Sequence, residues 1–289
     1  MSAPELIRDP STWQARCTAA RDGGTRIALV PTMGYLHDGH VSLMREARRR
    51  ADQGGKRGLS LATIFVNPTQ FGPGEDLARY PRDLEGDLEK CGRAGVDLVL
   101  APEDPRAVYP SGFQTWVDVE EVSKGLCGDR RPGHFRGVAT VVAKLFGLSR
   151  PHVALFGDKD WQQLQVIRRM ALDLDMGVEV VGMPIVREAD GLAMSSRNAY
   201  LSPEERGRAV AISRALAEAR HRAGAGERDP ATLAAGVRTA IEAAGMRVDY
   251  VELVHPESLR PVERAEPGTR ALAAAFLGRT RLIDNVALP

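Results

Sequence analysis

The sequence predicts an α/β protein with a doubly wound, parallel, Rossmann-like sheet and a second, smaller α+β domain. Two observations support this fold class. Up to residue 183, short apolar runs alternate with amphipathic helical patterns, as parallel strands joined by helices do. After Pro184, helical patterns come first and strand-like segments follow, which is typical of a separate α+β unit. We therefore expect a first domain over residues 1–183 and a second over residues 184–289.

The strands of the first domain are expected to be nearly all apolar, because a parallel strand is covered on both faces. Leu59–Val66 fits this pattern, and Val41–Asp52 is an amphipathic helix with its apolar residues on one side. The expected order is strand Arg26–Val30, helix Val41–Asp52, strand Leu59–Val66, helix Asp83–Ala94, strand Val96–Leu100, helix Phe135–Leu148, strand Val153–Phe156, helix Trp161–Leu174 and strand Val178–Val181.

The second domain is expected to contain two long helices and three strands. The helical patterns are rich in alanine, arginine and glutamate and cover Pro203–Gly224 and Pro230–Gly245. The strand-like segments are Val248–Val254, Arg270–Leu277 and Thr280–Val286.

Composition limits the classes of partner and compartment. The formal net charge of the 289 residues is +1, which gives no overall electrostatic case for binding nucleic acid or membranes. Cys17, Cys91 and Cys127 are far apart and form no C-x-x-C pair, so a disulfide framework or zinc cluster is not expected. Residues 1–10 lack the apolar core of a signal peptide, and no stretch approaches the roughly 18 apolar residues of a membrane span. We expect a cytoplasmic protein.

One segment combines several features of a nucleotide site. An apolar run over residues 27–30 leads into a turn that contains Gly34, and His37 and His40 open the next helix. The backbone N–H groups at a helix N-terminus attract anions, and residues three apart share a helix face. The alternative is an ordinary strand–turn–helix connection in which Asp38 caps the helix and the histidines have no role.

Two polar segments follow later in the first domain. Asn67 and Gln70 come directly after a buried strand, and their amides suit the recognition of hydroxyl and carboxylate groups. Arg130, Arg131 and His134 form a basic cluster ahead of an apolar helix, which suits an anion. The alternatives are a polar Asn-Pro turn for the first segment and a solvated run of charge for the second.

Two more segments suggest phosphate binding. A strand ends in glycine and charge before the helix at residue 161, where Lys159 can neutralise a phosphate and Asp160 can equally be an N-cap. Ser195–Arg197 brings two hydroxyls and a guanidinium together, which suggests a clamp on phosphates. A capped helix start is the alternative there, although Pro203 is the more natural start of that helix.

Taken together, the chain resembles the pantothenate synthetases, the pantoate–β-alanine ligases of the nucleotidyltransferase superfamily that includes class I aminoacyl-tRNA synthetases. The resemblance rests on five segments in family order and spacing: Pro31–His40, Asn67–Arg82, Arg131–Leu145, Gly157–Gln163 and Met194–Asn198. It continues more weakly through Val248–Pro261 and Thr280–Val286, so it spans nearly the whole chain.

The resemblance implies an AMP-forming ligase of pantothenate and coenzyme A biosynthesis. Such an enzyme condenses (R)-pantoate with β-alanine, using ATP and Mg²⁺, and releases pantothenate, AMP and diphosphate through a pantoyl-adenylate. The partners are then these small molecules, and a homodimer is the expected assembly. It further implies a nucleotide- and pantoate-binding first domain. Because the adenylate is labile in water, we expect the second domain to close over it as a lid.

Site residues are carried over from the family position by position. Gln70 and Gln163 resemble the glutamines that hold pantoate, with Gln70 also near β-alanine, and Asn67 and Arg131 line the same pocket. The expected catalytic residues are His37, His40, Lys159 and Arg197. The expected ATP contacts are Met33, Gly34, Tyr35, Leu36, His37, Asp38, Gly39, His40, Gly157, Asp158, Lys159, Asp160, Val186, Met194, Ser195, Ser196 and Arg197.

The chain departs from the family pattern at two of these positions, and its metal ligands are unknown. Tyr35 stands where the family often has a smaller residue, and Asp158 replaces a frequent glutamate; neither change removes a phosphate-binding group. Asp87 lies in a region that can approach magnesium, but the neighbouring Gly86 and Lys90 are poor ligands.

Two rival functions share parts of this pattern. A nucleotidyltransferase that joins a nucleotide to a phosphorylated alcohol or to nicotinamide mononucleotide has the same histidine loop, but it leaves AMP in its product. A catalytically silent nucleotide sensor would bind ATP without turnover. Against the sensor stands the complete set of His37, His40, Lys159, Ser195, Ser196 and Arg197.

Overall fold

The structure, a computed structural model, describes residues 3–289. They divide into two compact units, the first made of the residues up to Asp158 with Val166–Met183, the second of Lys159–Gln165 with Pro184–Pro289. The sequence pattern places Lys159–Gln165 in the first domain, but in the structure this stretch clusters with the second unit. Among the helices of residues 3–289, none has both the length and the apolar character that a membrane crossing requires.

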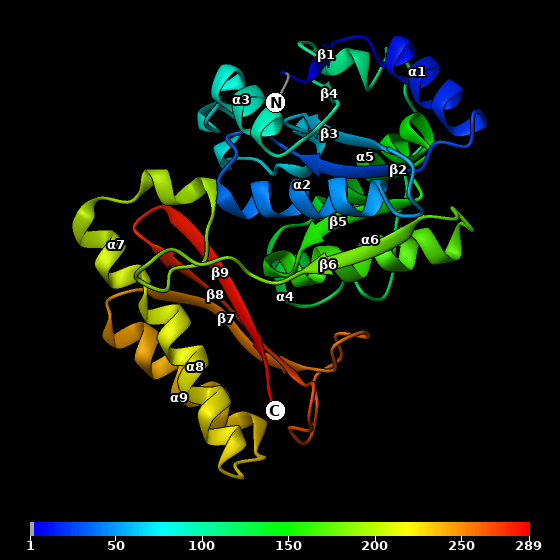
Figure 1. The fold of residues 1–289 in the computed structure, drawn as a ribbon. Coiled ribbons are helices and arrows are strands. Elements are labelled where there is room, and N and C mark those ends of the chain that lie inside the picture. Colours follow the sequence, from blue (N-terminus) through cyan, green and yellow to red (C-terminus); the bar gives the residue numbers. More distant parts are fainter. Residues whose placement is uncertain (1–2) are drawn as a thin grey trace. The chain divides into compact units, whose positions relative to one another are not determined.

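The first unit is built on a parallel sheet with the strand order β1-β4-β3-β2-β5-β6 (Figure 1). The predicted doubly wound parallel sheet is thereby confirmed. Its elements are β1 (Glu5–Ile7), α1 (Pro10–Asp22), β2 (Ile27–Thr32), α2 (Asp38–Ala51), β3 (Leu59–Ile64), α3 (Leu84–Arg93), β4 (Leu98–Leu100), α4 (Leu126–Arg130), α5 (His134–Ser149), β5 (Val153–Gly157), β6 (Glu179–Met183) and the larger part of α6 (Trp161–Asp173), from Val166 onward.

The strand order reverses between β2 and β5, which pair with each other. From β2 the chain crosses to β3 on one side, whereas from β5 it crosses to β6 on the other side. The carboxyl ends of these two adjacent strands therefore form a switch point, where open α/β sheets bind their ligands. The loop that starts at Met33 and the turn at Gly157 and Asp158 both leave the sheet at this edge.

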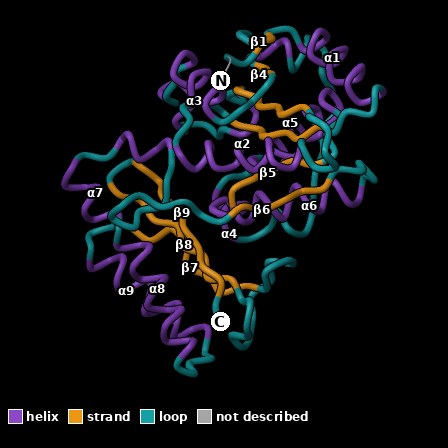
Figure 2. Tube along the Cα trace, viewed as in Figure 1, coloured by secondary structure: helices purple, strands orange, loops and turns teal. Residues whose placement is uncertain are grey.

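Helices cover both faces of the parallel sheet (Figure 2). Met44 and Ala47 of α2 are fully buried against the sheet in one core. Helices α1 and α5 lie on the opposite face, because right-handed crossovers that run in opposite directions across a sheet use opposite faces. There the indole N–H of Trp13 donates to Ser149 Oγ at 2.9 Å and joins α1 to α5.

The second unit is an antiparallel sheet of the order β7-β8-β9, with α8 and α9 packed on it (Figure 2). The predicted α+β unit is present, but the expected helix Pro203–Gly224 is two helices that meet at Val210. Small buried alanines in β8 allow the helices to pack closely on the sheet. The elements are α7 (Pro203–Ala209), α8 (Ala211–Gly224), α9 (Pro230–Ala243), β7 (Arg247–Val254), β8 (Arg270–Leu277) and β9 (Thr280–Ala287).

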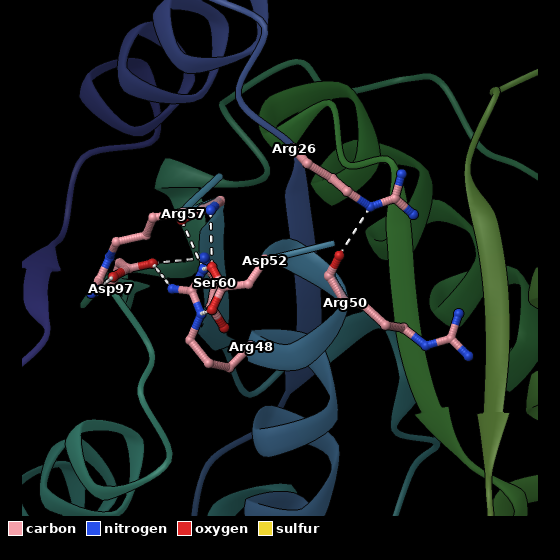
Figure 3. Close-up of polar contacts among 8 residues, drawn as sticks. Arg26, Arg48, Arg50, Asp52, Arg57, Ser60 and Asp97 are labelled. Atoms are coloured by element: carbon pink, nitrogen blue, oxygen red, sulfur yellow. Dashed lines mark hydrogen bonds and ion pairs between the residues drawn. The ribbon is translucent and has the colours of Figure 1, made fainter. Parts of the chain in front are cut away.

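At the amino ends of the parallel strands, opposite the switch point, an ionic network ties α2 to the sheet (Figure 3). Asp97, next to β4, accepts hydrogen bonds from Arg48 Nη1 at 2.5 Å, Arg57 Nη2 at 2.8 Å and the Ser60 backbone N–H at 2.8 Å. Arg48 also binds Asp52 at the end of α2. The network therefore fixes the start of β3 and β4 against the last turn of the helix.

Replacing Asp97 with alanine is expected to lower the free energy of unfolding by about 1–3 kcal/mol, because the half-buried Arg48 loses a charged partner. Urea denaturation followed by circular dichroism measures the change. The control is Glu103→Ala, which removes an exposed pair with Arg8 and is expected to cost less than about 1 kcal/mol. Equal losses for the two variants would contradict the role given to the network.

Candidate active site

The loop between β2 and α2 has a backbone that only a glycine can form at its first bend. Gly34 has a φ of +83°, and a Cβ there would lie 2.9 Å from Ile64 Cγ2 and 3.0 Å from Asp87 Oδ2. Tyr35 follows with a φ of +49°, so two successive residues lie in the left-handed region. The chain thereby turns sharply from the end of β2 toward the first turn of α2.

Asp87 of α3 holds this loop in place. Its carboxylate accepts the backbone N–H of Tyr35 at 2.8 Å and that of Leu36 at 2.6 Å. The side chain is 1% exposed, and burial raises the pKa of Asp87 above its ordinary value although the two backbone hydrogen bonds oppose this. The structure thus assigns Asp87 an anchoring contact to the loop, which its sequence context did not predict.

The two histidines do open α2, but the cap differs from the expected one. His37 is the N-cap residue and Asp38 is the first residue of the helix, so the capping role considered for Asp38 is wrong. His40 Nδ1 accepts the backbone N–H of His37 at 3.3 Å, and the two ring centroids are 4.1 Å apart. Since Nδ1 is the acceptor, a neutral His40 carries its proton on Nε2, which leaves that atom as a donor.

Asn67 and Gln70 lie together in the short turn after β3, beside the loop of β2. Asn67 Nδ2 donates to Gln70 Oε1 and to the Gly137 carbonyl, both at 3.1 Å, and Gln70 Nε2 donates to Met33 Sδ at 3.1 Å. Gly137 of α5 permits this approach, because a Cβ there would lie 2.4 Å from the Thr69 carbonyl oxygen. The amide of Gln70 is therefore placed next to the β2–α2 loop.

Arg131 reaches the same turn, but its charge is already paired. Its guanidinium forms a two-pronged contact with Glu75, with Nε–Oε1 at 2.7 Å and Nη2–Oε2 at 2.6 Å, and also donates to the Gln70 carbonyl at 3.2 Å. Burial raises the pKa of Glu75, but the hydrogen bonds and charge of Arg131 outweigh it and hold that pKa below its ordinary value. His134 Nδ1 lies 2.8 Å from the same carbonyl.

Lys159 belongs to the second unit, where β9 holds its backbone. Asn285 Nδ2 donates to the Lys159 carbonyl at 3.0 Å, and Lys159 Nζ lies 3.5 Å from Asp160 Oδ2. Two residues later the Trp161 indole N–H donates to the Pro256 carbonyl at 2.8 Å. These contacts explain why Lys159–Gln165 clusters with the second unit, and the role of Asn285 was not predicted from the sequence.

The segment with the two serines is also held by β9. A hairpin precedes it, with the Met194 N–H donating to the Val186 carbonyl at 3.0 Å. Arg187 in the hairpin forms a two-pronged ion pair with Asp284, a residue 4% exposed, at 2.6 and 3.0 Å. The segment then becomes a 3-10 turn over Ser196–Tyr200, which Ser195 caps by accepting the Arg197 N–H at 3.3 Å.

The expected site residues are divided between the two units. The first unit holds those in the β2–α2 loop, the turn after β3, Arg131, Gly157 and Asp158. The second unit holds Lys159, Asp160, Gln163, Val186 and Met194–Arg197. Gln70 and Gln163, both expected to hold pantoate, therefore lie in different units.

Comparison with known proteins identifies the family. The family model for pantoate–β-alanine ligase matches residues 5–287. The chain belongs to the pantoate–β-alanine ligase family. It is 73% identical to a pantothenate synthetase of Anaeromyxobacter dehalogenans (strain 2CP-C) over the full length of both chains. It is 59% identical to a pantothenate synthetase of Myxococcus xanthus (strain DK1622), with 98% of this chain and 95% of the relative covered.

Solved structures of pantoate–β-alanine ligases have the same fold. A pantothenate synthetase from Thermus thermophilus superposes with a TM-score of 0.91 at 46% identity, covering 99% of this chain and 100% of the other. The enzyme from Francisella tularensis, solved in complex with β-γ ATP and β-alanine, has a TM-score of 0.81 at 28% identity, covering 99% and 98%.

The family membership settles the class of reaction. The chain is a ligase of pantothenate biosynthesis that joins pantoate to β-alanine. The predicted enzyme class is confirmed, and the rival nucleotidyltransferase and nucleotide sensor are set aside.

Proposed function

We propose that the enzyme works in two steps through a pantoyl-adenylate. The pantoate carboxylate attacks the α-phosphorus of ATP, which forms an acyl–phosphate bond and expels diphosphate. The amine of β-alanine then attacks the acyl carbon, so that AMP leaves and pantothenate is released with loss of a proton. The carboxylate is unreactive toward amines until AMP becomes its leaving group, and this is why the order of steps is fixed.

The observation that carries this proposal is the contact between Gln70 and Met33. Gln70 is the residue expected to hold pantoate, and its Nε2 lies 3.1 Å from the sulfur of Met33 at the start of the expected ATP loop. A carboxylate bound at Gln70 would be close to phosphates bound along Met33–His40. Adenylation requires this juxtaposition, because most of its catalysis is positioning and electrostatic stabilisation.

In the first unit, we propose that the ATP phosphates bind to His37, His40 and the backbone of Met33–Gly39. The turn at Gly157 and Asp158 leaves the sheet beside this loop and contributes further ATP contacts. Gln70 and Asn67 form hydrogen bonds with the hydroxyl and carboxylate groups of pantoate. Because the charge of Arg131 is paired with Glu75, we propose that Arg131 supports this pocket indirectly. Its hydrogen bond to the Gln70 carbonyl holds Gln70 in place.

In the second unit, we assign the neutralisation of the phosphate charge to Lys159 and Arg197. Ser195 and Ser196 donate hydrogen bonds to the leaving diphosphate. Asp160, Val186 and Met194 complete the ATP contacts, and Gln163 binds pantoate. The adenylate is labile in water, so we further propose that this unit serves as its lid. The complex of the Francisella tularensis enzyme with β-γ ATP and β-alanine supports the choice of substrates.

Magnesium enters this proposal as part of the ATP substrate. Residues 3–289 contain no group of three or more His, Cys, Asp and Glu side chains arranged to hold a metal. Asp87, which the sequence suggested near magnesium, has each carboxylate oxygen engaged by a loop N–H. We therefore propose that the magnesium ion is bound by the phosphates of ATP. A homodimer remains the expectation from the family resemblance, and a cytoplasmic location remains the expectation from the cysteine pattern. Sedimentation analysis of the purified protein tests the assembly.

Asp87→Asn is expected to weaken ATP binding about tenfold or more, because one loop N–H then faces an amide donor and loses its partner. Equilibrium titration with a non-hydrolysable ATP analogue measures the change. Asp83→Asn is the control, since it removes the same charge from the start of α3, where asparagine caps equally well. Unchanged affinity in Asp87→Asn would show that the loop does not depend on this anchor.

Product analysis tests the proposed reaction as a whole. With ATP, pantoate and β-alanine, we expect equal amounts of AMP, diphosphate and pantothenate. Formation of ADP and phosphate would mean that the carboxylate is activated as an acyl-phosphate, and the adenylate proposal would be abandoned.

A further inference from the structure

Asn198 ties the segment Ser195–Arg197 to the hairpin before it. The side chain is 9% exposed, and its Nδ2 donates to Glu188 Oε1 at 2.8 Å and to the Ala193 carbonyl at 3.0 Å. Its Oδ1 has no hydrogen-bond partner within residues 3–289. The two amide hydrogens of Asn198 therefore make the connection.

Glu188 extends this connection to α7. Its Oε1 accepts from Asn198, whereas its Oε2 forms an ion pair with Arg206 of α7. Arg206 Nε also lies 3.1 Å from Asp190 Oδ2, and Asp190 Oδ1 accepts the Leu192 N–H at the tip of the hairpin at 3.1 Å. The hairpin, the serine segment and α7 are thus joined through one glutamate.

We propose that Asn198 and Glu188 are positioning residues for the adenylation step. They hold the turn capped by Ser195 in a fixed shape. In that shape, Ser195, Ser196 and Arg197 are presented to the leaving diphosphate. The inference rests on the phosphate contacts assigned to these three residues in the proposed function. Neither Asn198 nor Glu188 is itself given a contact with substrate.

The chemistry explains why an amide is needed at position 198. An aspartate has the same size but lacks both hydrogens that reach Glu188 and Ala193. It would also set one carboxylate against another at about the present 2.8 Å. Both changes push the turn away from Glu188, and a displacement of roughly 1 Å at such a site costs about a hundredfold in rate.

The first arm of the test is Asn198→Asp, assayed by exchange of labelled diphosphate into ATP with pantoate present and β-alanine absent. We expect kcat/KM for ATP in this exchange to fall about a hundredfold. Aminolysis of supplied pantoyl-adenylate by β-alanine is expected to change less than about threefold, because diphosphate has already left. Equal losses in the two assays would overturn the proposal, since a general loss of folded enzyme reduces both alike.

The second arm is rescue by a complementary change. In Asn198→Asp combined with Glu188→Gln, the glutamine Nε2 can donate to the aspartate, and the like-charge contact disappears. Exchange should recover about tenfold relative to Asn198→Asp alone, although the Ala193 carbonyl still lacks its donor. A double variant no better than the single one would show that Glu188 is not the partner through which Asn198 acts.

Two controls separate this inference from its alternatives. Val237→Ala opens a small cavity in α9, far along the chain from the turn, and so lowers stability without touching it. It should leave the ratio of exchange to aminolysis unchanged, and a shifted ratio would count against the proposal. The wild-type protein tests the proposed function itself: if it shows no exchange without β-alanine, the two-step mechanism fails independently of Asn198.

Discussion

His40→Ala is expected to lower the rate of adenylation by about a hundredfold or more while the protein remains folded. The structure fixes the tautomer of this side chain, because Nδ1 accepts the His37 N–H and leaves Nε2–H as the donor. A preorganised donor of this kind stabilises charge that develops on the phosphates. Steady-state kinetics with circular dichroism and thermal unfolding measure the two parts of the prediction.

Two further variants separate the phosphate contact from the helix cap. Asparagine at position 40 places an oxygen where Nδ1 lies and keeps the cap, whereas glutamine places its amide nitrogen near the position of Nε2. His40→Asn should therefore be as slow as His40→Ala, and His40→Gln should retain more activity than either. Full activity in His40→Asn would reduce His40 to a capping residue.

Lys159→Ala is expected to suppress diphosphate–ATP exchange by about a hundred- to a thousandfold, because an ammonium charge is lost where the phosphate bond breaks. Aminolysis of supplied pantoyl-adenylate should be much less affected, since diphosphate is absent from that step. Lys159→Arg keeps the charge and should be intermediate in exchange.

Lys124→Ala is the matched control for Lys159→Ala. It also removes one lysine charge, but from an exposed pair with Glu121 in the first unit. Exchange in this variant should equal that of the unmodified protein. If Lys159→Ala slowed aminolysis as much as exchange, Lys159 would act on the acyl carbon or on folding, and its assignment to the phosphates would be wrong.

Much of the fold follows from apolar periodicity alone. Strand β3 is mostly apolar, although it also buries Ser60 and Thr63, and α2 has a clear apolar stripe, so both were predicted within a few residues. Helix α1 was not predicted, because only Trp13 and Cys17 are buried and its apolar stripe is correspondingly narrow. The division of Pro203–Gly224 into two helices at Val210 was also missed, since no glycine or proline marks that position.

The site residues were predictable where a polar side chain comes soon after a predicted strand. His37 and His40 come after β2 and Gln70 comes after β3, and the sheet topology brings the ends of these two strands to one edge. The supporting residues were not predictable in this way. Asp87 and Asn285 act through backbone groups more than fifty residues away in the sequence, and nothing in their local pattern distinguishes them from a surface aspartate or a strand asparagine.

Exchange of labelled diphosphate into ATP, measured with pantoate and without β-alanine, distinguishes the two-step mechanism from a concerted one. We expect exchange that requires pantoate, because diphosphate is released and recaptured while the pantoyl-adenylate is held on the enzyme. We also expect β-alanine to consume this intermediate and so to lower the exchange as pantothenate forms. Exchange that appears only when β-alanine is present would instead show a concerted reaction of three substrates and would contradict the pantoyl-adenylate mechanism.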